Sequence, residues 1–556
     1  MPYRAPVSEL RFVLDHVVGF EKVAATETFA EATPDTVEAI LTEAGKMCEE
    51  VLAPLNRAGD LTPATLENGV VRTSPGFAEG FAAIAEGGWV GMSADPEHGG
   101  MGLPITLTMG VNEMISSACL SLQLNPLMTQ GQIEALEAHA SDEIKDLYIP
   151  KLISGEWCGT MNLTEPQAGS DVGALRTKAE PNGDGTYAVT GQKIYISWGD
   201  NDFSENVCHL VLARLPDAGP GTKGISLFMV PKRLPNEDGS VGVANTLKVV
   251  SLEHKLGLHG SPTAVMEYDG ATGWLVGEPH DGMAAMFTMM NNARLGVGVQ
   301  GLGVAEAAMQ HAIGYALDRK QGKTGRDADH ILEHADVRRM VLGMKADTFA
   351  TRAIAMDCAV SLDMAKATGD AAWKARGAFL TPIAKAFGTD TGIKVAQDGI
   401  QVHGGMGFVE ETGAAQYLRD VRVTAIYEGT NGIQAMDLVG RKLMDGGAAA
   451  YALLDEIEGF GHAALTDAAG HLRALTEWML AQDMQDRFAG AVAYLAAFAR
   501  VLGAYYHLKG AAADAARAPL ANYAAGRMLP EAMAEMAKAR TGAEELYAVS
   551  TEVIAA

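Results

Sequence analysis

The chain has 556 residues, of which 48% are hydrophobic, so it can bury a large core and form several packed units. Its 43 Lys and Arg against 69 Asp and Glu give a formal net charge of −26, which argues against nucleic acids and anionic membranes as partners, because both attract basic patches. Five cysteines without C-x-x-C spacing indicate buried thiols in a reducing compartment, and no metal site is expected. Residues 1–12 lack a signal-peptide pattern, so we expect a cytoplasmic protein.

Local patterns divide the chain into four blocks. Apolar residues first have helical spacing, with Thr33 as a candidate N-cap; β-rich runs bounded by Gly, Pro, Asn and Asp follow, and long helical segments then return. The strands are expected at 185–199, 206–215 and 224–234. An Ala-rich helical block without a Gly/Ser linker ends the chain, so we expect it to pack on the rest. The predicted domains are an N-terminal helical domain, a central antiparallel β domain, a helical bundle and an extra C-terminal helical domain, at 1–155, 156–277, 278–446 and 447–556.

Two Gly-rich motifs have an interpretation that does not require a ligand. The segment "GVGVQG" (296–301) matches G-x-G-x-x-G, but no strand precedes it, so small residues in a helix–helix contact explain it better than a dinucleotide site. The segment "HGGMGF" (403–408) is similar to the oxyanion turn of esterases, but the chain has no G-x-S-x-G nucleophile. A turn between helices, or a close backbone approach to a ligand, remains for this second motif.

Three other segments carry polar groups that could bind a ligand. "MNLTEPQAGSD" (161–171) could be an ordinary tight turn. In "GQKIYISWG" (191–199), Tyr195 and Ser197 alternate with isoleucines and would share one strand face, which suits a flat ring ligand or a half-exposed strand. "YALDRKQGK" (315–323) ends a helix with basic residues, which either stabilise the helix C-terminus or clamp a phosphate.

The segment "AIYEGTNGIQ" (425–434) places Glu428 in an apolar run, with no Lys or Arg within five residues on either side. A surface carboxylate at a helix end is the ordinary interpretation. Together, however, "LTEPQAGSDV", "GQKIYIS", "ALDRK", "QVHGGMGF" and "YLRDVRVTAIYEGTNGIQ" resemble the acyl-CoA dehydrogenase family in order and spacing over residues 40–442. The extra C-terminal block and the start "MPYRAPVSELRFVL" resemble the branch containing 3-methylmercaptopropionyl-CoA dehydrogenase.

The resemblance implies an α+β multidomain fold with a C-terminal four-helix bundle, and oxidation of an acyl-CoA to the trans-2-enoyl-CoA with hydride passing to N5 of FAD. Glu428 matches the catalytic base, and the implied substrate contacts are Ser170, Arg294 and Tyr427. The implied FAD contacts are Met161, Leu163, Thr164, Ser170, Tyr195, Ser197, Arg319, Gln321, His334, Gln401, Gly404, Gly405 and Thr430. Tyr195 and Ser197 depart from the usual Trp-x-Thr but keep an aromatic ring and a hydroxyl. The segment "QGKTGRDADH" before the His334 region is longer than the family norm.

Proton abstraction explains why Glu428 has no local cation. The base must lie about 3 Å from the α-proton of the thioester, and an adjacent cation would weaken it by lowering its pKa by ~1–3 units. Desolvation has the opposite effect. In some branches the base precedes the position of Arg294, but Ala293 stands there, so Glu428 is the only candidate at either place.

The resemblance also implies partners and leaves alternatives open. Electrons would pass to an electron-transfer flavoprotein, and FAD contacts that cross subunits imply a homo-oligomer, a dimer or a tetramer. The substrate would be 3-(methylthio)propanoyl-CoA or another short or medium acyl-CoA, in fatty-acid metabolism or DMSP degradation. An acyl-CoA oxidase and a non-catalytic or DNA-associated flavoprotein are the rivals. The last of these would need a basic C-terminal block, whereas residues 449–556 carry eight Lys and Arg against 13 Asp and Glu.

Overall fold

The computed structural model describes residues 3–326 and 329–556, so Asp327 and Ala328 of the long "QGKTGRDADH" segment, and the first two residues, lie outside the described part. The chain divides into two compact units. Unit 1 comprises residues 1–45, 104–117 and 294–556, and unit 2 comprises residues 46–103 and 118–293. The boundaries of the four predicted domains remain a prediction.

Unit 2 is built around a mixed sheet in which, within the described residues, seven strands pair in the order β10-β11-β5-β4-β6-β3, with β7 joined to β11 and β6. Its main strands are β3 (Trp157–Asn162), β4 (Lys178–Pro181), β5 (Tyr187–Ser197), β6 (Asn206–Arg214), β7 (Ile225–Pro231), β10 (Leu247–Leu252) and β11 (Thr263–Val276). The three predicted strands are confirmed as β5, β6 and β7. Most pairings are antiparallel as expected, but β3 pairs parallel to β6, and β4 touches β6 in parallel.

Short elements complete unit 2. They are a π-helix (Cys48–Leu52), α4 (Ala53–Leu61), the hairpin of β1 (Thr65–Glu67) and β2 (Val70–Arg72), α5 (Phe77–Glu86), α7 (Asp142–Ile153) and the pair β8 (Arg233–Pro235) and β9 (Val241–Ala244). Two long helices run through both units in sequence: α6 (Ile105–His139), which is interrupted by a non-helical Cys119, and α8 (Gly282–Asp318). Residues 114–133, a run without charged side chains, lie in α6 and are buried.

Unit 1 is helical. Its helices are α1 (Val7–His16), α2 (Glu21–Ala24), α3 (Pro34–Met47), α9 (Ala335–Thr368), α10 (Ala371–His403), α11 (Ala414–Val421), α12 (Asn431–Gly440), α13 (Ala448–Gly459), α14 (Ala463–Ala481), α15 (Met484–Ala513), α16 (Ala518–Ala539), α17 (Glu544–Ala548) and α18 (Thr551–Ala555). Thr33 caps α3, since its hydroxyl accepts a hydrogen bond from the N–H of Thr36 at 3.2 Å. The fold class expected from the sequence is confirmed.

Glycines bring α8 and α10 into close contact. A Cβ atom on Gly298 would lie 2.6 Å from the carbonyl oxygen of Ala384, and one on Gly388 would lie 2.5 Å from the carbonyl oxygen of Gly298. Only glycine permits this backbone approach. The "GVGVQG" motif is therefore a helix–helix contact, as the sequence indicated, and it holds α8 beside α10.

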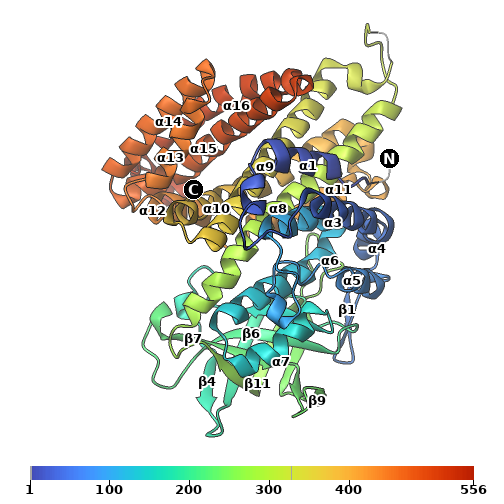
Figure 1. Cartoon of the computed structure of the whole chain (residues 1–556), viewed down its shortest axis with the longest axis vertical. Helices are drawn as coiled ribbons and strands as arrows, with labels where there is room; N and C mark the ends of the chain where they lie inside the picture. The colour runs from blue at the N-terminus through green and yellow to red at the C-terminus, as the bar shows by residue number, and fades with distance from the viewer. Residues whose placement is uncertain (1–2, 327–328) are drawn as a thin grey trace. The chain divides into compact units, whose positions relative to one another are not determined.

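The C-terminal block packs on the bundle, as expected. Figure 1 shows α15 and α16 side by side, and α15 also packs against α9 and α12. The Arg376 guanidinium of α10 bonds Asp357 of α9 at 2.7 Å and Glu456 of α13 at 2.8 Å, which ties the block to the bundle. Helix α15 is long and apolar enough to cross a membrane, but 67% of its most apolar window is buried within the protein, and this packing accounts for its composition.

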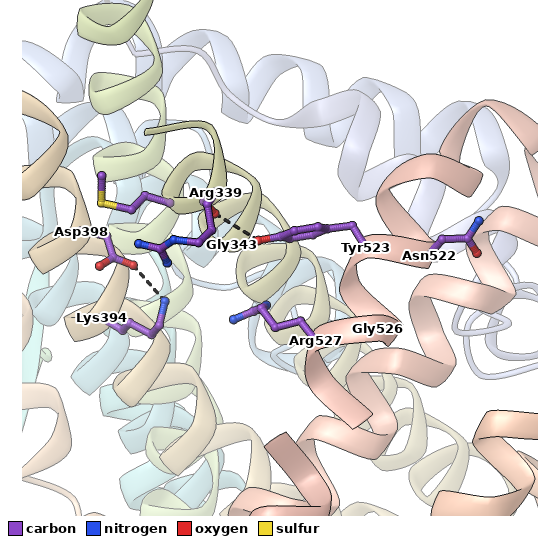
Figure 2. Close-up of a pocket in the computed structure, with 9 residues that line it drawn as sticks. Arg339, Gly343, Lys394, Asp398, Asn522, Tyr523, Gly526 and Arg527 are labelled. Carbon is purple, nitrogen blue, oxygen red and sulfur yellow. Dashed lines mark hydrogen bonds and ion pairs between the residues drawn. The ribbon is translucent and has the colours of Figure 1, made fainter. Parts of the chain in front are cut away.

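A cavity of about 500 Å³ lies where the block meets the bundle, between α9, α10 and α16. Figure 2 shows the Tyr523 hydroxyl pointing toward Arg339, and it donates to the carbonyl oxygen of Arg339 at 3.1 Å. Gly343 and Gly526 also line it, and a Cβ on either would meet no atom within 4 Å. The cavity is therefore open space that larger side chains at these helical positions would partly fill.

Candidate active site

Glu428 lies in the loop that leads into α12, and its backbone is left-handed, with φ of +55°, followed by Gly429 at +81°. This conformation costs an ordinary residue of order 1–3 kcal/mol and persists only where surrounding contacts impose it. Gly429 is required as well, because a Cβ there would lie 2.7 Å from the Gln434 amide nitrogen. The loop is therefore shaped by contacts that hold a strained glutamate in place.

Three side chains supply these contacts. Lys385 of α10 donates to the carbonyl oxygen of Gly429 at 2.9 Å, and Gln434 of α12 donates to the carbonyl oxygen of Glu428 at 3.2 Å. Thr430 caps α12, because its hydroxyl accepts from the N–H of Ile433 at 3.2 Å. The loop at 428–430, the base loop, is thus fastened both to α10 and to α12, which follows it directly.

The Glu428 carboxylate makes no hydrogen bond or ion pair with any residue that the structure describes. The Glu428 side chain is partly exposed, but the atoms packed around it desolvate the carboxylate, and this burial raises its pKa to about 7. Arg294 and Lys385 oppose this effect from a distance. The expected desolvated, unpaired carboxylate is present; the missing local cation, however, is partly replaced by two cations from distant segments.

The predicted substrate contacts Arg294 and Tyr427 belong to the same unit as Glu428. Arg294 begins the unit 1 part of α8, is buried, and lies 3.7 Å from Asp437 of α12. Its Nε atom has no hydrogen-bond partner in the described part of the chain. The Tyr427 hydroxyl donates to the side-chain oxygen of Gln300, which comes from the "GVGVQG" segment. Ser170, the third predicted substrate contact, is in unit 2 and is exposed.

A second group of predicted positions in unit 1 is open to solvent. His334 is half-buried beside Gln321, with its Nε2 atom 2.7 Å from the Gln321 carbonyl oxygen, and the Ile331 N–H donates to the carbonyl oxygen of Arg319. Gln401 lies in the last turn of α10, and a Cβ added to either of the two glycines that follow the helix would meet nothing within 4 Å. The exposed positions are Arg319, Gln321, Gln401, Gly404 and Gly405.

The remaining predicted cofactor positions come together in unit 2. Met161 is the second-last residue of β3, and Leu163 and Thr164 follow the strand. The Ile194 N–H of β5 donates to the Thr164 carbonyl oxygen at 2.9 Å. Tyr195 lies at a register shift between β5 and β11, with φ of +60° and a 61% exposed side chain. Ser197 follows on the same strand and is half-buried.

Sequence reasoning missed the ion pair beside these predicted cofactor positions of unit 2. Lys193 of β5 is completely buried and donates to Glu165 at 2.8 Å and to the Leu163 carbonyl oxygen at 3.0 Å. Glu165 also accepts from the backbone N–H groups of Arg176 and Thr177. The sequence did offer one signal, a lysine inside a strand with an alternating pattern. If the sheet buries this lysine, its charge needs a partner.

In unit 2, the exposed Tyr195 ring and the Ser197 hydroxyl two residues on fit the flat ring of FAD. Separately, the open glycine backbone at 404–405 in unit 1 fits a phosphate group. The N-terminal, middle and C-terminal domains of acyl-CoA dehydrogenase match residues 34–156, 160–271 and 280–444. The chain belongs to the acyl-CoA dehydrogenase family. It is an oxidoreductase of a family that generally binds FAD.

Relatives of known name support the assignment. The chain is 49% identical over 458 residues to 3-methylmercaptopropionyl-CoA dehydrogenase of Ruegeria pomeroyi, covering 81% of this chain and 78% of that protein. It is 36% identical over 461 residues to a butyryl-CoA dehydrogenase of Syntrophomonas wolfei, covering 79% and 75%. In fold it is similar to Caenorhabditis elegans ACDH-11, with a TM-score of 0.80 at 20% identity over 95% of this chain and 91% of that one. This structural match extends over the C-terminal block.

Proposed function

We propose that this acyl-CoA dehydrogenase oxidises a short-chain acyl-CoA to the trans-2-enoyl-CoA, with Glu428 as the base that removes the α-proton. The observation that carries the proposal is a strained, desolvated carboxylate without a hydrogen bond, whose pKa is raised to about 7. A base with this pKa is ionised in part at neutral pH and is strong enough to accept the proton. FAD, when bound, would supply the hydride acceptor.

The backbone of the same loop can stabilise the negative charge that develops on the thioester oxygen. Among the described residues, the Glu428 N–H has no hydrogen-bond acceptor. An N–H group held in place by a strained loop is suited to receive an enolate oxygen, and one such donor can be worth ~3–4 kcal/mol. Glu428 would therefore act twice, through its carboxylate and through its backbone.

We further propose 3-methylmercaptopropionyl-CoA as the preferred substrate, because of the 49% identity to the Ruegeria pomeroyi enzyme. An electron-transfer flavoprotein is the proposed acceptor, and the proposed location is the cytoplasm. A homo-oligomer is supported by the exposed predicted cofactor positions around 401–405, which continue into an apolar surface where Phe408 is 87% exposed. A second copy of the chain would cover it.

The test uses the enzyme purified with FAD and mixed with 3-methylmercaptopropionyl-CoA, butyryl-CoA and longer acyl-CoAs under anaerobic conditions. We expect the flavin absorbance to bleach fastest with the methylthio substrate, and Glu428→Gln to keep bound flavin but lose bleaching. Undiminished bleaching in Glu428→Gln would refute the role of Glu428. Stoichiometric peroxide during aerobic turnover would instead identify an oxidase.

A further inference from the structure

Lys385 is a completely buried lysine in the middle of α10, and no carboxylate lies within ion-pair distance of it in the part of the chain that the structure describes. Its Nζ atom donates to two neutral acceptors, the Gly429 carbonyl oxygen and the Asn431 side-chain oxygen, each at 2.9 Å. Burying an ammonium without a counter-charge costs several kcal/mol. A packed helix would lose less by placing an apolar residue there, so a function other than stability is indicated.

The contacts of Asn431 show how firmly the lysine is tied to the base loop. The Asn431 amide nitrogen donates to Asp390 at 2.8 Å and to the Thr389 hydroxyl at 3.0 Å, both on α10. Lys385 and Asn431 therefore join α10 to both sides of Thr430. This double fastening holds the left-handed conformation of Glu428 and Gly429.

The charged groups around Lys385 come from three elements. Glu428 faces it from the loop, Asp390 lies one turn further along α10, and Arg294 faces it from α8. Asp437 of α12, which lies 3.7 Å from Arg294, offsets part of the charge of that arginine. Burial lowers the pKa of Lys385 to about 8, so the ammonium is still mostly protonated at neutral pH.

We propose that Lys385 is a positioning residue that fastens the base loop and keeps the Glu428 carboxylate ionised without forming an ion pair with it. The proposal rests on the proposed role of Glu428 as the base. A direct salt bridge would occupy the carboxylate oxygens that must receive the proton. By donating to the neighbouring carbonyl and amide oxygens instead, Lys385 supplies a positive field and leaves those oxygens free.

The test compares Lys385→Met, which removes the charge and both hydrogen bonds, with Lys385→Gln, which removes the charge but keeps a donor. Lys394→Met is the matched control, because Lys394 is also on α10 but is half-exposed and pairs with Asp398 at 2.9 Å. The rate of flavin bleaching by butyryl-CoA is measured in a single turnover from pH 5.5 to 9, after flavin content has been equalised.

We expect the acid limb of the rate profile to move to higher pH by roughly one unit in both Lys385 variants, which makes them about tenfold slower at low pH relative to their own plateaus. The plateau itself should fall in Lys385→Met and be better retained in Lys385→Gln. Lys394→Met should match the wild type.

Acid limbs at the wild-type pH in both Lys385 variants would overturn the inference and leave Lys385 a structural residue. That outcome is distinguishable from failure of the proposed function. If Glu428→Gln still bleaches, the base is elsewhere; if it does not bleach and the Lys385 variants keep the wild-type acid limb, only the role of Lys385 is wrong.

Discussion

Replacing Glu428 by glutamine should stabilise the protein, and the gain should depend on pH. The two side chains have nearly the same shape, and the Glu428 carboxylate makes no hydrogen bond within the described structure that the amide would lose. Burial raises the pKa of Glu428 to about 7, against an ordinary value of 4.5. The folded protein therefore holds this proton more tightly than the unfolded chain does, and ionising Glu428 opposes folding.

The magnitude follows from the difference between the two pKa values. Each pKa unit corresponds to about 1.4 kcal/mol, so a difference of about 2.5 units corresponds to about 3.5 kcal/mol. Below pH 4.5 the carboxyl is protonated in both states and costs nothing. Between pH 4.5 and 7 the free energy of unfolding of the wild type falls progressively, and above pH 7 the full cost of ionising the buried carboxyl is present. Glutamine has no such dependence.

The assay is the thermal midpoint of the two proteins, measured at equal FAD concentration at pH 5 and pH 8. We expect Glu428→Gln to exceed the wild type by a few degrees at pH 8 and by much less at pH 5. Glu411→Gln, a change at an exposed carboxylate in the same unit, should show no such difference. An equal gap at both pH values would mean that Glu428 is not desolvated, and the reasoning about the base would fail.

Other changes test the packing around the site by the thermal midpoint. Gly388→Ala should lower stability by about 1–3 kcal/mol, because its Cβ would lie 2.5 Å from the carbonyl oxygen of Gly298. Gly526→Ala should raise stability by about 0.5–1 kcal/mol, because this helical position faces the cavity of Figure 2. Arg352→Met should cost about 3–5 kcal/mol at pH 8, since it leaves the buried carboxylate of Glu113 without its cation, and less at pH 5, where burial lets that carboxylate protonate.

Much of the fold could be predicted because its signals are local. The run 206–215 became β6 (Asn206–Arg214), since β-branched and apolar residues bounded by turn formers specify a strand without reference to the rest of the chain. The parallel pairing of β3 with β6 could not be predicted, because it depends on which strand edges are free after the chain has crossed the sheet. The interruption of α6 at Cys119 has no proline or glycine to announce it.

In the candidate site, too, some features could be predicted from the sequence and others could not. Motif order predicted Glu428 as the base, but nothing in "AIYEGTNGIQ" indicates a left-handed glutamate, because this conformation is imposed by contacts from α10 and α12. The Lys193–Glu165 pair was missed because its partners are 28 residues apart and each residue alone has an ordinary interpretation, as a strand lysine and a turn carboxylate.

The cations near Glu428 show why a local sequence window is the wrong measure of electrostatic environment. Counting charges within five residues correctly indicated that the carboxylate has no salt bridge, yet Lys385 and Arg294 still lower its pKa across space. A base for a weakly acidic proton needs both conditions: free oxygen atoms, and enough positive potential to be ionised at neutral pH. Cations from the chain neighbourhood would tend to form the ion pair itself. Cations on separate helices can satisfy both conditions at once: Lys385 donates its hydrogen bonds to oxygen atoms of Gly429 and Asn431, and Arg294 lies beside Asp437.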